Sequence, residues 1–152
     1  MVKRALLLIL LAAAGLFAVR SVSRWRARTA YEGFAEAWTH GDMAEAKKYG
    51  TDEAATHALK EASLRGLQSG AAMEAFRGTR YSYESESRTD SGDVELQVRQ
   101  TIFFDPPGIT SAIGGAMYTG ISHTVTLRNT SEGWRVVAFE PKYLDMGPVR
   151  KR

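Results

Sequence analysis

The chain has 152 residues, a formal net charge of +3 at pH 7 and no cysteine. Its first 28 residues hold six basic side chains and no acidic one, so the rest of the chain has three more acidic than basic residues. This balance excludes a basic nucleic-acid-binding surface, and the lack of cysteine excludes disulfides, thiolate metal sites and a lipidated cysteine.

An unbroken apolar run, residues 5–19, lies close to the start of the chain and is flanked by basic residues. As a helix, this run would span roughly 22 Å, against about 30 Å for the hydrocarbon layer of a bilayer. The long side chains of Lys3, Arg4 and Arg20 can reach the interface on either side, and Trp25 is an aromatic residue of the kind found at headgroup level. We therefore predict a membrane anchor at residues 1–26.

Two other interpretations of residues 1–26 stay open. A basic start followed by an apolar run is also typical of a cleaved secretory signal peptide, and Ser21 and Ser23 are small residues at the spacing that signal peptidase requires. The run could also be a buried helix of a soluble domain. For an uncleaved anchor, the very short basic segment before the apolar run favours a single-pass membrane protein whose C-terminal domain is exported, to the periplasm or the cell exterior.

Three helices are predicted after the anchor. Residues 27–39 have apolar side chains at helical spacing, and Gly41 follows the end of this pattern. Asp42 and Glu45 form a capping box that begins a second, short helix. The third helix is predicted at residues 52–67.

Four strands are predicted in the second half of the chain, at residues 79–89, 94–104, 121–128 and 134–140. Their side chains alternate between apolar and polar, and Pro141 is expected to end the last strand because proline cannot donate to a sheet ladder. The order predicts an α+β domain at residues 27–143, in which three helices pack on a curved four-stranded antiparallel sheet. Residues 144–152 are expected to form a basic C-terminal tail.

The connection between the second and third strands, residues 109–119, is interrupted by glycine and is longer than a hairpin needs. It is interpreted either as a loop or short helix that packs over the open end of the sheet, or as a partner-binding segment.

Two phrases of the sequence carry a resemblance to a known family. They are FAEAWTHGDMAEA at residues 34–46 and GWRVV at residues 133–137. Together with the order of elements they resemble the nuclear-transport-factor-2-like (cystatin-like cone) superfamily over about residues 27–143. In that family a Gly-Asp step separates the first helix from a short one, and a Gly-Trp pair opens the last strand. The resemblance implies a bent antiparallel sheet wrapped around helices, with a conical cavity.

Within that superfamily, a short anchor followed at once by the cone domain is similar to exported, membrane-tethered members of unknown function. It is also similar to periplasmic assembly factors of type IV secretion machines, which are usually longer. The resemblance thus implies a scaffold or interaction role. The superfamily also includes small-molecule isomerases, dehydratases and cyclases, whose cavity residues are typically Asp, His and Tyr.

Strand alternation selects the polar residues that would face such a cavity. Gln100, His123 and Glu140 are expected on the inner face of the sheet, and Tyr81 and Tyr83 could add hydroxyl groups. Burial shifts the pKa of such groups, so His123 could act as general acid or base with Glu140 or a tyrosine as its partner. The competing interpretation is that each buried polar residue only forms a hydrogen bond with a neighbour.

No metal site or other cofactor is predicted. His40, His57 and His123 fall on a turn, a helix and a strand, and no pair of them has the spacing of a metal-binding motif.

Two functional hypotheses remain. The first is a membrane-tethered, non-enzymatic domain for protein–protein interaction or envelope assembly, which binds a protein partner or forms a homodimer through the open sheet face and residues 108–120. The alternative is a small enzyme, or a carrier of a small hydrophobic ligand, with an apolar cavity around His123. A deep pocket at His123 would favour the alternative, and a filled core with an exposed apolar sheet face would favour the first.

Overall fold

The computed structural model describes residues 22, 25–64, 66–105 and 117–148, and they form an α+β domain. A first helix occupies residues 25–40. It is followed by α2 (Met43–Tyr49), α3 (Asp52–Leu64), α4 (Gly70–Ala75), β1 (Phe76–Arg88), β2 (Val94–Phe104), β3 (Met117–Thr130) and β4 (Gly133–Pro148). The strands form one antiparallel sheet in the order β1-β2-β3-β4, so the predicted four-stranded architecture is confirmed.

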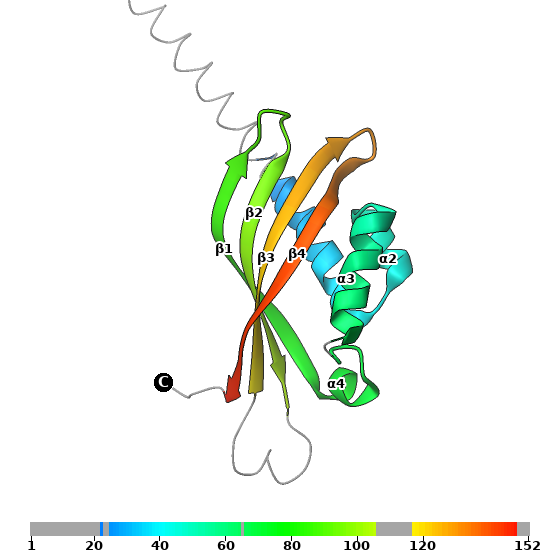
Figure 1. The fold of residues 1–152 in the computed structure, drawn as a ribbon, viewed down its shortest axis with the longest axis vertical. Coiled ribbons are helices and arrows are strands. Elements are labelled where there is room, and N and C mark those ends of the chain that lie inside the picture. Colours follow the sequence, from blue (N-terminus) through cyan, green and yellow to red (C-terminus); the bar gives the residue numbers. More distant parts are fainter. Residues whose placement is uncertain (1–21, 23–24, 65, 106–116, 149–152) are drawn as a thin grey trace, which may run out of the picture.

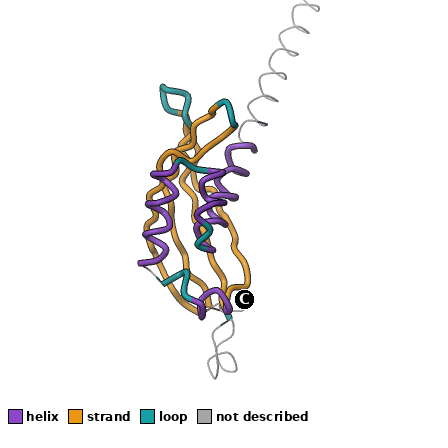
Figure 2. The backbone as a smooth tube through the Cα atoms, turned by 90° about the vertical axis from the view of Figure 1, so that its right-hand side faces the viewer, coloured by secondary structure: helices purple, strands orange, loops and turns teal. Residues whose placement is uncertain are grey.

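The helices lie on one face of the sheet (Figure 1). Seen from the side, the sheet curves around them, with the first helix held inside the curve (Figure 2). Tyr31, Phe34 and Trp38 are the largest side chains that this helix buries, and they pack with the inward-facing residues of the sheet. Burial of such large side chains is the main free-energy gain that holds the two layers together.

No helix among these described residues is long and apolar enough to cross a membrane. The apolar run at residues 5–19 lies outside the described residues, as do most of residues 1–26. The predicted connection at residues 109–119 is described only from residue 117, and residues 117–119 belong to β3, which begins four residues earlier than predicted.

The predicted helix boundaries rest on caps that the structure contains. Gly41 has a φ of +74°, which ends the first helix and turns the chain. Asp42 then accepts a hydrogen bond from the backbone N–H of Glu45 at 2.9 Å and begins α2. The third helix ends at Leu64, three residues earlier than predicted. The short α4 was not predicted; the Ser69 hydroxyl accepts from the N–H of Ala72 and caps it.

The fourth strand is much longer than predicted. It runs to Pro148, so Pro141 does not end it and the first residues of the expected tail belong to the sheet. Pro141 is tolerated because β4 is an edge strand, where a missing N–H can face away from the partner strand. The domain therefore extends to residue 148, beyond the predicted boundary at 143.

An irregularity in β4 changes which residues face the core. Thr126 pairs with Ala138, but the next residue, Leu127, pairs with Val136, so Val137 is an extra residue in β4. One inserted residue reverses the inward–outward alternation beyond it. As a result Phe139 is buried and Glu140 is exposed, so the expectation that Glu140 faces the interior was wrong.

Candidate functional site

A chain of hydrogen bonds links the first helix to the middle of the sheet. The Thr39 hydroxyl donates to the Ala35 carbonyl at 2.7 Å and accepts from Nε2 of Gln100 at 3.0 Å. The other end of the Gln100 amide, Oε1, lies 2.8 Å from Nε2 of His123. Because an amide oxygen can only accept, His123 carries its proton on Nε2 and donates it to Gln100. Gln100 and His123 thus face the interior, as predicted, and contact each other.

His123 is enclosed by aromatic rings. Its side chain is 2% exposed, and its ring centroid lies 4.9 Å from that of Phe139, 5.7 Å from that of Trp38 and 6.0 Å from that of Tyr31. Burial disfavours the charged imidazolium and lowers the pKa of His123 to about 3. The imidazole is therefore neutral at physiological pH, with Nδ1 as an acceptor.

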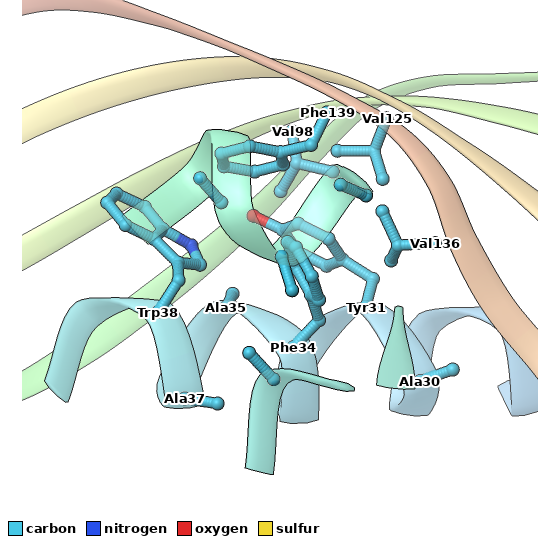
Figure 3. Close-up of a cluster of buried hydrophobic side chains, with 14 of the residues drawn as sticks. Ala30, Tyr31, Phe34, Ala35, Ala37, Trp38, Val98, Val125, Val136 and Phe139 are labelled. Atoms are coloured by element: carbon cyan, nitrogen blue, oxygen red, sulfur yellow. The ribbon is translucent and has the colours of Figure 1, made fainter. Parts of the chain in front are cut away.

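Three buried polar atoms in this region have no hydrogen-bond partner among the described residues. They are Nδ1 of His123, the hydroxyl group of Tyr31 and Nε1 of Trp38. Figure 3 shows the Tyr31 hydroxyl and the Trp38 ring nitrogen pointing toward one another beneath Phe139. Two groups that can donate and one acceptor therefore belong to one cluster of aromatic side chains. In the sequence, helical spacing identifies Tyr31 and Trp38 only as core residues.

The tyrosines of β1 are half-buried and contact Tyr31, as His123 does. The Tyr31 ring contacts Tyr81 and Tyr83 edge-on, at centroid distances of 5.6 and 6.2 Å. The hydroxyl of Tyr83 donates to Oε1 of Glu32 at 2.5 Å. Burial is the main cause that raises the pKa of both β1 tyrosines, so both phenols stay protonated at neutral pH.

An ion pair joins the first helix to β1 on the same side of the domain. Arg28 lies 4.3 Å from the centroid of the Tyr83 ring and donates to Glu86 at 3.1 Å. These contacts join the first helix to β1 and engage Tyr83 in a structural network.

The structure does not bring His123 and Glu140 together. His123 is too weak a base near neutral pH, and the carboxylate expected beside it, Glu140, lies on the opposite face of the sheet. Three hollows in the described surface, of about 740, 640 and 380 Å³, include neither His123 nor Gln100; Glu140 lines the second of them, beside residues of α3. Within the described ranges, no three His, Asp or Glu side chains lie close enough together to hold a metal ion.

Acid should destabilise the domain through His123. The unfolded chain has an ordinary histidine pKa of 6.5 and binds a proton below it, whereas the folded chain does so only below about 3. Unfolding therefore takes up a proton between these values, and the free energy of unfolding falls as the pH falls. From pH 8 to pH 5 the expected loss is about 2 kcal/mol, measured by urea unfolding of the full chain in a non-ionic detergent.

Two substitutions isolate this contribution. His123→Gln keeps a side-chain donor for Gln100 but cannot titrate, so the loss of stability between pH 8 and pH 5 should shrink by about 2 kcal/mol. His57→Gln removes an exposed histidine of α3 and should leave the wild-type loss unchanged. Equal losses in the two variants would contradict the buried, neutral state of His123.

Comparison of the chain with protein-family models, with curated proteins and with solved structures gave no match.

Proposed function

We propose that this chain is a membrane-tethered, non-enzymatic domain on the exported side of a membrane, which acts in protein–protein interaction or envelope assembly. The observation that carries the proposal is the combination of a basic-flanked apolar run at residues 5–19 with an interior whose central histidine is enclosed by rings. The first feature favours a fixed location, and the second favours a function at the surface.

The outer face of the sheet is the surface that supports partner binding. The described helices cover the other face (Figure 1), and the outward residues of the strands are mostly polar. The exposed ones include Arg80, Ser82, Gln97, Arg99, Thr124 and Glu140. The exposed apolar sheet that the interaction hypothesis expected is therefore not what these strands present. A partner on this face, whether another protein or a second copy, would be held mainly by hydrogen bonds and ion pairs.

We also propose membership of the nuclear-transport-factor-2-like superfamily. Gly41 and Asp42 form the step between the first helix and α2, and the Gly133-Trp134 pair opens β4. The curved antiparallel sheet around the first helix is in keeping with a cone domain (Figure 2).

Crosslinking in intact membranes tests the partner. A photoreactive residue placed at Ser82 or Thr124 lies on the outer face of the sheet, and one placed at Ser63, an exposed residue of α3, serves as the matched control. We expect a discrete crosslinked species, with a partner or a second copy, from the first two positions and none from the control. Recovery of monomer alone from all three positions would contradict the proposal.

A second candidate is a carrier of a small ligand, and the three unpartnered atoms of Tyr31, Trp38 and His123 are the observation that favours it. A ligand bound between them would satisfy all three. In the variant Trp25→Phe/Trp134→Phe only Trp38 emits, so a ligand there should change the emission when small phenols or carboxylic acids are added. Unchanged emission across such a set would remove this candidate.

A further inference from the structure

One surface groove lies where the first helix begins. It has a volume of about 740 Å³ and lies between the first turns of that helix, the end of α2 and the turn from β3 to β4. Figures 1 and 2 place the beginning of the helix and this turn at the same end of the domain. Residues more than 100 positions apart in the sequence, Trp25 and Trp134, therefore line a single hollow.

Exposed apolar side chains are concentrated in this groove. Three large apolar side chains in the described ranges are strongly exposed, and two of them, Val22 (50% exposed) and Trp25 (68%), line the groove. Trp134 adds a partly buried ring at its other side. Indole rings have an apolar body and one polar N–H, which suits a boundary between water and hydrocarbon.

The charges around the groove favour an anionic neighbour. Arg26 and Lys48 line it; Lys48 is paired with Glu45, whereas Arg26 has no ion-pair partner in the part of the chain that the structure describes. One carboxylate lines the groove, that of Glu132. It is paired with Arg135 at 2.6 Å, and this pairing reduces the repulsion of an anion. Arg135 also donates to the Gly50 carbonyl at 2.6 Å, which fixes the turn against the end of α2.

The sequence limits how far the groove can move from the apolar run. Trp25 follows Val19, the last residue of that run, by six positions. Even a fully extended chain covers at most about 3.6 Å per residue, so Trp25 stays within roughly 20 Å of the end of the run. If residues 5–19 enter a bilayer, the groove lies close to its headgroup layer.

We infer that this groove is a membrane-docking surface. It contacts anionic phospholipid headgroups of the same bilayer that holds the apolar run at residues 5–19. Trp25 and Trp134 lie at headgroup level, and Arg26 and Lys48 face lipid phosphates. The inference depends on the membrane tether proposed above and adds an orientation: the far end of β4 points away from the bilayer.

Fluorescence quenching by lipid tests this contact. The full chain is reconstituted in vesicles of phosphatidylcholine and phosphatidylglycerol, with or without phospholipids brominated near the headgroup end of their acyl chains. Trp25→Phe retains Trp134 and the buried Trp38, whereas Trp25→Phe/Trp134→Phe retains Trp38 alone. We expect brominated lipid to remove the share of emission that comes from Trp134 in the first variant and to leave the second unchanged.

The outcomes separate this inference from the tether. If the chain floats with the vesicles but Trp134 is not quenched, the domain stands away from the bilayer and the docking surface is wrong, while the tether stands. If the chain does not float, both proposals fail. Adding Arg26→Glu and Lys48→Glu to the single variant should reduce the quenching of Trp134 without loss of flotation; unchanged quenching would contradict the role of the two cations.

Discussion

Replacing Trp38 with alanine should lower the free energy of unfolding by about 3–5 kcal/mol, the cost of removing a large aromatic side chain from a core. The same replacement at Trp25 should change it by less than about 0.5 kcal/mol. Both residues lie on the first helix, but Trp38 is fully buried among His123, Phe139 and the sheet, whereas Trp25 is 68% exposed. Urea unfolding of the two full-length variants, compared with the wild type, measures the difference.

This pair of variants also distinguishes the two functional hypotheses. A filled core around His123 requires the full cost at Trp38, because the space left by the ring has no other side chain to occupy it. If a functional cavity were already open beside Trp38, the side chain would bury less apolar surface, and its replacement would cost less than this range. Similar stabilities of Trp38→Ala and Trp25→Ala would therefore contradict the closed interior on which the surface role depends.

Most of the helices and strands could be predicted from local signals. Asp42 and Thr51 cap α2 and α3 through side-chain oxygens. Each of these contacts joins residues three positions apart, so it can be predicted from the local sequence. Gln100 and His123 were placed inside by simple alternation, and they are inside.

The failures have a common cause, since each depends on contacts between distant parts of the chain. The extra residue at Val137 can be recognised only from the pairing of β4 with β3, and it moves Glu140 to the outer face. Pro141 could be kept in a strand because β4 lies at the edge of the sheet, which is a property of the topology.

The partners within the candidate site were also beyond local reasoning. The hydrogen bond from Gln100 to Thr39 spans 61 positions in the sequence, and the groove brings Trp134 beside Trp25. Trp134 was identified only as the start of a strand. An exposed aromatic residue indicates such a surface, but its exposure can be recognised only in the folded structure.

Two acids in the apolar run should release the chain from the membrane. Each aspartate near the centre of a membrane-spanning helix costs about 2.5–3.5 kcal/mol, so Leu8→Asp/Leu11→Asp should cost about 6 kcal/mol. This corresponds to a loss of roughly 10⁴-fold in partitioning. Leu64→Asp, at an exposed leucine of α3, is the matched control and should leave membrane association unchanged.

Extraction of membranes with alkaline carbonate, followed by detection of the intact N-terminus, tests the tether most directly. A membrane tether at residues 1–26 predicts that the wild type and Leu64→Asp stay in the membrane pellet with these residues attached, while Leu8→Asp/Leu11→Asp moves to the supernatant. Release of wild-type chain that still carries its first residues would show that the tether is wrong.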